Sequence, residues 1–474
     1  MEGETKKLKG SLGVASIVMM VVATAAPLTV MVANTPLMIS MGNGVSAPVN
    51  AFIATVIMLL FTVGFVAMSK YISNAGAFYA FIQKGLGRSV GLGSATLAVV
   101  SYAMILIALQ AFIGYATADV VNKVIGIEVP WWVYSFFAVA IIGYLGYRDI
   151  ELSSKFLGIA LVLEIAVVIL VDIAVLWEKG PSGLEMATWE LGNIISGSPG
   201  LGILFAIFSF IGFESTVIYR EEAKDPERTI PRATYIAVLL VGAFYVISMW
   251  CAVSFIGASH IADYSEKHGA DLYLAVTQHY FGVVFMDIMH VLLITSLFAC
   301  ALSLHNIVVR YKYTLGRFGV LNARFANVHA THGSPHVSSG ILSAVCLVGF
   351  IALTVIGADP ASEIYAWGAM AGTLGYMAIL SLTCAAVVMF FRREKTHASL
   401  WTTLIAPVGG LLGILGCLWV ALSNLPDLIG GDNAKTVSTL VVLFLLATFA
   451  FGFWVANRFR TQQPARYEAL SQLA

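Results

Sequence analysis

Apolar stretches of about 20 residues recur along the chain, with short polar segments between them. A run of that length crosses the ~30 Å hydrocarbon layer of a bilayer as one α-helix. We count twelve such stretches, so the pattern predicts an all-α integral membrane protein with 12 transmembrane helices. Their expected ranges are 13–40, 48–69, 92–121, 131–147, 155–177, 201–220, 233–257, 282–309, 337–357, 362–391, 403–424 and 437–457. No segment between them is long enough for a further domain, so residues 1–474 are expected to form a single one.

The sixth stretch is interrupted near its middle by Ser209, Gly212 and Glu214. A carboxylate at bilayer depth is costly unless it faces protein or water, so Glu214 is a functional candidate. Gly212 lets the backbone leave helical geometry. Unwound backbone at that depth is tolerated only where it lines a cavity, and a helix interrupted at the midplane is typical of a transporter binding site. The alternative is a kinked helix in which Glu214 is paired for structural reasons.

The first stretch carries a second interruption, at Thr24 and Pro27. Proline lacks an N–H and clashes with the preceding turn, so the helix must bend or open there. The alternative is a proline kink without function. The two interrupted helices lie five apart, and an odd number of crossings inverts the topology. Helices 1–5 and 6–10 are therefore expected to form inverted repeats with breaks in matching positions.

The fifth stretch holds another carboxylate, Glu164, near the centre of a run that is otherwise free of charge up to Asp172. It is either part of a functional site or a buried acid satisfied by hydroxyl groups. Gln110 in the third stretch and Ser296 in the eighth are weaker candidates, because such residues also hold helices together by hydrogen bonds. Trp367 precedes a small-xxx-small spacing at 368–372, and interfacial anchoring explains a tryptophan there about as well as a pocket does.

Composition excludes a soluble protein of this size, because 59% of the residues are hydrophobic and 11% are charged, with a mean hydropathy of +0.88. The net charge of zero gives no support for a nucleic-acid partner. The five cysteines all lie in apolar stretches, so we expect buried thiols and neither disulfides nor a metal site.

The distribution of basic residues predicts the orientation in the membrane. With both termini in the cytoplasm, only four of the 26 Lys and Arg residues lie outside, as the positive-inside rule requires. These four are Lys123, Lys179, Lys267 and Lys435.

The polar segments contain no pattern of a catalytic site, whether GxxxxGK[ST], HExxH or GxSxG. His329, His332 and His336 cluster after the eighth stretch, but no carboxylate or cysteine accompanies them, which favours a solvated loop over a metal site. We therefore expect a protein that is not an enzyme and that needs neither a metal nor a cofactor.

Three segments carry a resemblance to a known family. The most specific is FSFIGFESTVIYREEAKDPERTIPRA at 208–233, in which Gly-Phe-Glu precedes a Glu-Glu, Pro, Arg, Ile-Pro-x-Ala loop. The others are LHNIVVRYKYTLGRFGVL at 304–321 and MSKYISNAGAFYAFIQKGLG at 68–87. Together they resemble the amino acid–polyamine–organocation (APC) transporter superfamily, over nearly the whole chain.

The resemblance implies a LeuT-like 5+5 inverted repeat plus two C-terminal helices. The first repeat would occupy about 13–177, the inverted second repeat about 201–391, and the extra helices about 403–457. Substrate would bind between the broken first and sixth helices. Backbone N–H groups near 25–28 would receive a carboxylate, and carbonyls of 208–211 would accept hydrogen bonds from an ammonium.

The resemblance also implies roles for single residues. Phe210 would cover the site, and Glu214 matches an acid implicated in proton coupling in some members. The expected substrate-binding residues are Thr24, Ala25, Ala26, Pro27, Leu28, Gln110, Phe208, Phe210, Ile211, Gly212, Glu214 and Trp367. The expected ion-coupling residues are Glu164, Glu214 and Ser296.

Two departures from the family pattern widen the range of substrates and ions. Many members have a Gly-Ser-Gly-type stretch in the first helix, where this chain has Ala25-Ala26-Pro27-Leu28, which admits amines without a carboxylate. Certain members place a lysine in the fifth helix, near the sodium position of relatives, where this chain has Glu164. A carboxylate there could carry a proton, hold Na⁺ or counter a cationic substrate.

The sequence thus predicts a secondary active transporter in the cell membrane, importing an amino acid or related amine by alternating access with H⁺ or Na⁺ as coupling ion. A carboxyl group excluded from water is more easily neutralised than an exposed one, so Glu164 or Glu214 would carry the proton. The alternatives are a polyamine or amino-alcohol importer, an obligate exchanger, or a membrane sensor that binds substrate without transporting it.

Overall fold

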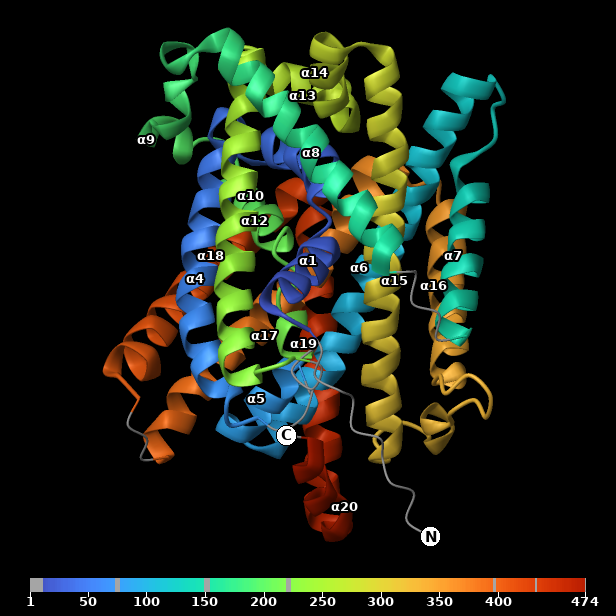
Figure 1. Ribbon diagram of the computed structural model, residues 1–474. Coiled ribbons are helices and arrows are strands. Elements are labelled where there is room, and N and C mark those ends of the chain that lie inside the picture. The colour runs from blue at the N-terminus through green and yellow to red at the C-terminus, as the bar shows by residue number, and fades with distance from the viewer. Residues whose placement is uncertain are drawn as a thin grey trace.

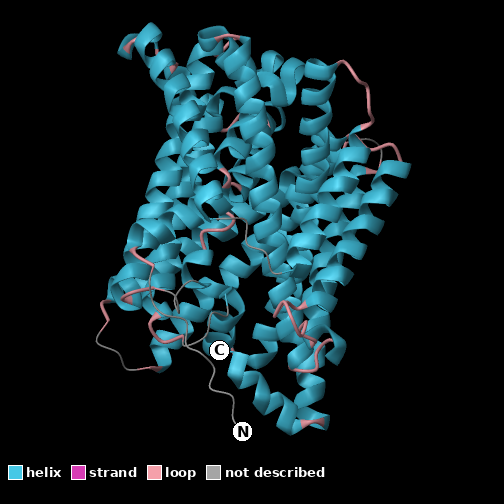
Figure 2. Ribbon diagram, turned by 45° about the vertical axis from the view of Figure 1, so that its right-hand side comes forward, coloured by secondary structure: helices cyan, strands magenta, loops and turns pink. Residues whose placement is uncertain are grey.

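The computed structural model describes residues 12–72, 77–148, 154–218, 223–394, 398–430 and 433–473, and these are almost entirely helical. No β-strand occurs in this part of the chain, where an isolated bridge joins Leu12 to Ala223. Residues 73–76 and 219–222, which belong to two of the family-like motifs, lie outside the described residues. Figure 2 shows helices throughout the bundle, with most loops at its two ends.

The long helices coincide with the predicted apolar stretches, and several extend a turn or two beyond them. The continuous ones are α4 (Ala47–Ser69), α6 (Arg88–Ile125), α7 (Trp131–Arg148), α8 (Ser154–Lys179), α12 (Pro226–Ile256), α15 (Val283–Arg317), α16 (His336–Val355), α17 (Ala366–Arg393), α18 (Ala406–Ile429) and α19 (Ala434–Gln462). Short π-helical segments, Pro360–Tyr365 and Trp401–Ile405, lead into α17 and α18. The predicted first and sixth helices are built from shorter pieces.

Nine helical stretches within the described ranges are long and apolar enough to cross a membrane. One of them, Val14–Ser69, contains two of the predicted helices, while α7 and the short Pro199–Phe208 are not among the nine. Large apolar side chains are exposed on the outside of the bundle, as for Trp177 at 90% and Trp419 at 71%. The chain is therefore a multi-pass membrane protein, and the number of twelve crossings stays a prediction.

Glycines let α17 pack closely on α6. A Cβ at Gly372 would lie 2.3 Å from Ile105 Cγ1, and one at Gly368 would lie 2.7 Å from Ala108 Cβ. These are the small residues whose spacing predicted a close helix approach. The contact places Ile105 of α6 deep in the centre of the bundle, where it is 1% exposed.

Short helices cover the two ends of the bundle (Figure 1). α9 (Leu191–Ile194), α13 (Ile261–His268) and α14 (Leu272–Phe281) lie at one end, and α5 (Ala77–Leu86) and α20 (Pro464–Ala469) lie at the other. In the orientation predicted from the basic residues, the α20 end faces the cytoplasm.

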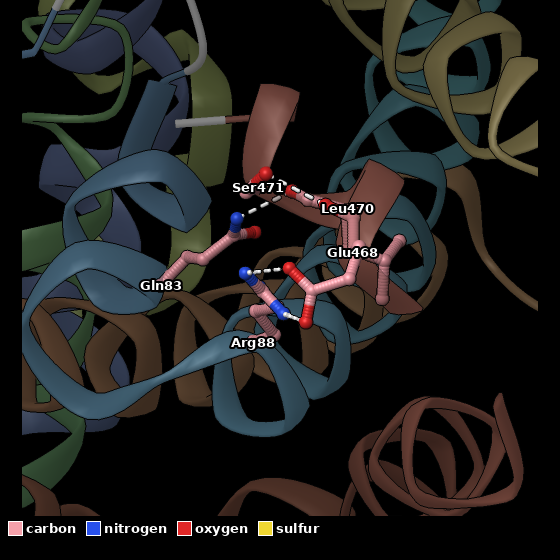
Figure 3. A network of polar contacts seen from close by, with 5 residues as sticks. All are labelled: Gln83, Arg88, Glu468, Leu470 and Ser471. Atoms are coloured by element: carbon pink, nitrogen blue, oxygen red, sulfur yellow. Dashed lines mark hydrogen bonds and ion pairs between the residues drawn. The ribbon is translucent and has the colours of Figure 1, made fainter. Parts of the chain in front are cut away.

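The C-terminal segment docks on the α5–α6 corner through a small polar network (Figure 3). The two terminal guanidinium nitrogens of Arg88, Nη1 and Nη2, donate to the carboxylate oxygens of Glu468 at 2.9 Å each. The Gln83 side-chain amide donates to the Leu470 carbonyl at 2.5 Å, and the Leu470 side chain is fully buried. The hydrogen bonds from Arg88 lower the pKa of the Glu468 carboxyl group.

We expect Glu468→Gln to loosen this docked segment, because it removes the carboxylate charge that pairs with the Arg88 guanidinium. Because the docked state has the lower pKa, the contact is present above the ordinary carboxylate pKa and is lost as the pH falls through the lowered value. The anisotropy of a dye on a cysteine added after Ala474 should fall in the variant, with an undocked population about twofold larger. The wild type should approach the variant in acid. Glu394→Gln, an exposed carboxyl after α17, is the control, and equal anisotropy in all three proteins would contradict the docking role.

Candidate functional site

The predicted first helix is broken at Ala26. There α1 (Val14–Ala25) ends because Ala26 adopts the left-handed conformation, with φ 48° and ψ 68°, which is uncommon for a residue other than glycine. Pro27 then begins α2 (Pro27–Thr29), and π-helical turns carry the helix on to Asn43. The structure confirms the interruption predicted in this helix.

The break leaves peptide N–H groups without partners. The first hydrogen bond after it runs from the Val30 N–H to the Ala26 carbonyl at 3.2 Å. The N–H groups of Leu28 and Thr29 have no acceptor among the described residues. They are the unpaired donors of a helix start, and such donors attract an anionic group.

The predicted sixth helix is broken over six residues. α10 (Pro199–Phe208) ends at Phe208, turns follow, and α11 (Ser215–Ile218) begins the second part. Gly212 has φ 104°, which favours glycine. Within the described chain, the carbonyls of Ser209 and Ile211 accept no hydrogen bond. The interruption predicted at Gly212 is confirmed, and it leaves acceptors unpaired where the first break leaves donors unpaired.

The two breaks are in direct contact. A Cβ built on Gly212 would lie 2.5 Å from Cγ2 of Thr24, which belongs to the last turn of α1. A side chain at position 212 would therefore push the two helices apart, in addition to straining the backbone. Two features therefore favour glycine at position 212: the positive φ of the backbone and the close approach of Thr24.

A small cavity of about 30 Å³ lies between the breaks. Its walls come from both broken helices and from α6, α15 and the start of the α17 segment. The lining residues are Thr24, Ala25, Ala26, Thr29, Val30, Asn34, Ile105, Leu109, Phe208, Ser209, Ile211, Cys300, Leu304 and Tyr365. None of these side chains carries a full charge at neutral pH.

Five residues of the predicted substrate-binding set line the cavity and seven do not. The five are Thr24, Ala25, Ala26, Phe208 and Ile211. The seven are Pro27, Leu28, Gln110, Phe210, Gly212, Glu214 and Trp367. Leu28 and Gly212 each neighbour a lining residue in the chain, and the substrate contacts of the whole set stay a prediction.

The aromatic residues that line the cavity do not include Phe210. Phe210 packs edge-on against Tyr245 at 6.1 Å between ring centroids, so the covering role predicted for it lacks support. Phe208 and Tyr365 line the cavity instead, with their rings 6.1 Å apart. Trp367 belongs to a separate apolar cluster around Phe350.

Sequence reasoning missed a hydrogen-bonded group at the cavity wall. The Tyr365 hydroxyl donates to Asn34 Oδ1 at 2.7 Å, and Asn34 Nδ2 donates to the Ser209 hydroxyl at 3.0 Å. Asn34 is a polar residue in an apolar helix and could have been noticed for that reason. Its partners come from residues 175 and 331 positions away, which no local pattern reveals.

Glu214 lies behind the sixth-helix break and is 2% exposed. Its carboxylate accepts hydrogen bonds from the hydroxyl groups of Tyr102 on α6 and Tyr376 on α17, and from the Gly212 N–H at 2.9 Å. The acid thus joins the break to two long helices. It does not line the cavity, so a substrate would not touch it directly.

Glu164 of α8 approaches the cavity from another side and is 3% exposed. Its carboxyl group is hydrogen-bonded by Ser296 of α15. The Thr29 hydroxyl donates to the Ser296 hydroxyl at 3.4 Å, and Thr29 lines the cavity. The structure therefore brings two of the three predicted ion-coupling residues together, while Glu214 lies in a separate network.

A third buried carboxylate, Asp172, was not among the predicted site residues. It is 5% exposed, and it accepts hydrogen bonds from Ser248 of α12 at 2.5 Å and Tyr273 of α14 at 3.1 Å. It lies two helical turns beyond Glu164 on α8 and ties α14 to the bundle. Its depth in the apolar run was the signal in the sequence.

Possible metal ligands gather at the α14 end of the bundle. One oxygen each of Asp119 and Asp271 and one nitrogen of His290 lie within 4.8 Å of one another. The Lys123 ammonium is 2.8 Å from Asp119 and 3.9 Å from Asp271. This cation offsets part of the charge of the two carboxylates, which favours an ion-pair network over a metal centre.

Comparisons with known proteins match most of the chain. A family model described as amino acid permease matches residues 16–465. The low-affinity putrescine importer PlaP of Escherichia coli (strain K12) is 26% identical over 398 residues, 80% of this chain and 82% of that protein. The aromatic amino acid transport protein AroP of Salmonella typhimurium (strain LT2) is 26% identical over 72% of this chain and 74% of its own. The branched-chain amino acid permease BcaP of Bacillus subtilis (strain 168) is 23% identical over 61% and 58%.

We expect Gly212→Ala to destabilise the protein by about 2 kcal/mol or more, because it adds a positive-φ penalty to a contact with Thr24. The thermal unfolding midpoint in detergent measures the loss. Gly416→Ala is the matched control, since no atom lies within 4 Å of a Cβ at that position in α18, and there alanine should be neutral or stabilising by about 0.5–1 kcal/mol. A midpoint unchanged in both variants would show that the backbone at 212 is not constrained as described.

Proposed function

The chain belongs to the amino acid permease family, and on this premise we propose that it is a secondary active transporter that imports an amino acid or related amine across the cell membrane by alternating access. The observation that carries the proposal is the cavity between the two broken helices. Unpaired peptide donors on one wall and unpaired acceptors on the other are tolerated at that depth only where a polar solute or water can meet them.

The fold proposed for this function is the LeuT-like 5+5 inverted repeat with two further helices. The breaks at Ala26 and Gly212 support it, since they fall in the predicted first and sixth helices, five apart. On this proposal residues 13–177 and 201–391 are the two repeats, 403–457 are the extra helices, and both termini lie in the cytoplasm.

The binding mode follows from the unpaired groups. A substrate carboxylate would accept hydrogen bonds from the N–H groups of Leu28 and Thr29, as anions do at the N-termini of helices. An ammonium would donate to the carbonyls of Ser209 and Ile211. Phe208 covers the cavity together with the ring of Tyr365.

Coupling is proposed to involve the buried carboxyl groups, with a proton as the coupling ion. Glu164 is connected to the cavity by Ser296 and Thr29, so its protonation state is sensitive to what occupies the cavity. Glu214 holds the sixth-helix break to α6 and α17, so a proton there would change how firmly the break is held. Na⁺ at the hydroxyl and carboxylate oxygens around Glu164 is the alternative ion.

Import of a diamine is the second candidate function, because the putrescine importer named above is similar in sequence to this chain over 80% of its length. Obligate exchange of one amino acid for another would use the same cavity and the same two conformations, without net coupling to an ion.

We expect Glu164→Gln or Glu214→Gln to abolish concentrative uptake in proteoliposomes under an imposed pH gradient. An amide cannot take up and release a proton, so accumulation should fall by about tenfold or more, while counterflow of labelled against unlabelled substrate persists. Glu266→Gln on the exposed face of α13 is the matched control and should accumulate substrate normally.

Gradient-driven uptake that is unchanged in both variants would remove these two residues from the coupling role. Replacing the pH gradient by a Na⁺ gradient in the same liposomes distinguishes the two ions.

A further inference from the structure

Resting on the proposed function, we propose that the cavity selects a small zwitterionic amino acid with an uncharged aliphatic side chain, and that Ile105 and Leu109 of α6 set the upper limit on side-chain size. The relatives named above act on a diamine, on aromatic amino acids or on branched-chain amino acids. The geometry of this cavity distinguishes among these classes.

The charge of the lining argues against a diamine. A diamine carries an ammonium at each end, and the lining contains no carboxylate. One ammonium can be received by the unpaired carbonyls of the sixth-helix break. The other would be buried without a counter-charge, at a cost of several kcal/mol.

The nearby acids do not supply the missing charge. Glu214 is enclosed by the hydroxyls of Tyr102 and Tyr376. Glu164 is separated from the cavity by Ser296 and Thr29. Neither carboxylate lines the cavity, so each would have to leave its present partners to reach a bound amine.

The unpaired groups match one positive and one negative charge. The first break supplies two N–H donors, at Leu28 and Thr29, and the sixth supplies two carbonyl acceptors, at Ser209 and Ile211. A ligand that satisfies both sets carries a carboxylate next to an ammonium and no net charge. This is the backbone of an α-amino acid.

The remaining wall accepts an apolar side chain. Ile105, Leu109, Cys300 and Leu304 line the cavity from α6 and α15. The cavity's volume of about 30 Å³ is well below the roughly 300–1,000 Å³ typical of small-molecule sites. So little space favours a small aliphatic side chain against this wall, and an aromatic one would require that a wall residue be displaced.

Neither end of the apolar wall can easily retreat. Ile105 is backed by Gly372, at whose position a Cβ would already lie 2.3 Å from Cγ1 of Ile105. At the other end the Tyr365 hydroxyl is held by Asn34 at 2.7 Å. The size limit is therefore set by packing between α6 and α17 as well as by the cavity side chains.

The test is counterflow into proteoliposomes loaded with alanine, with external labelled alanine, valine, phenylalanine and putrescine compared at equal concentration. Alanine and valine should be taken up, and phenylalanine and putrescine should be taken up at least tenfold more slowly. Putrescine or phenylalanine uptake equal to that of valine would overturn the inference while leaving the proposed transport function intact.

Protein that gives no flux for any of the four solutes would contradict the proposed function itself. Thermal-shift titration of the same protein then still decides the inference, because a ligand that binds the folded state raises its unfolding midpoint. Stabilisation by valine and not by putrescine supports the inference, and the reverse result overturns it.

A specificity variant tests the role assigned to Ile105. Ile105→Ala should raise the ratio of phenylalanine uptake to valine uptake by about tenfold or more. The reason is that a few methylene groups in an apolar pocket discriminate between substrates by about 10–200-fold. Ile107→Ala is the matched control, because Ile107 is the same residue on the same helix and does not line the cavity. It should keep the wild-type ratio. An unchanged ratio in Ile105→Ala would overturn the role of this residue.

Discussion

The interior of a bilayer offers no hydrogen-bond partners to a peptide group, and this constraint decides where a site can be built in this chain. Its long continuous helices meet the constraint by pairing interior N–H groups with carbonyls one turn away. The first and sixth predicted helices do not, at Ala26 and at 209–214. Thr29, Ser209 and Ile211, whose peptide groups include unpaired donors or acceptors, all line the same small cavity, so the local departures from helix geometry lie at the candidate site.

Local sequence chemistry was enough to locate the two breaks. Proline at 27 and glycine at 212 act on their own backbone, so their effect is visible without knowledge of the fold. The apolar pattern likewise placed the long helices. Glu164 and Glu214 stood out because a charge in an apolar run demands an explanation. The structure gives each of them hydroxyl partners, at Ser296 for the first and at Tyr102 and Tyr376 for the second.

Properties that depend on helix rotation and on distant partners escaped the sequence. Phe208 and Phe210 are two residues apart, and only the direction in which α10 ends decides which ring covers the cavity. The hydrogen bonds among Asn34, Ser209 and Tyr365 join three separate segments. Twelve apolar stretches were predicted, while nine helical stretches in the described ranges qualify as spans by length and composition.

Ala26 has a consequence for how the first helix moves. Glycine turns freely through the left-handed region, but a Cβ confines the backbone to a narrow well there. The backbone at Ala26 is therefore less flexible than it would be at a glycine. The restricted backbone at Ala26 therefore limits how far the angle between α1 and α2 can change. A glycine at position 26 would allow α1 and α2 to change their relative orientation more freely.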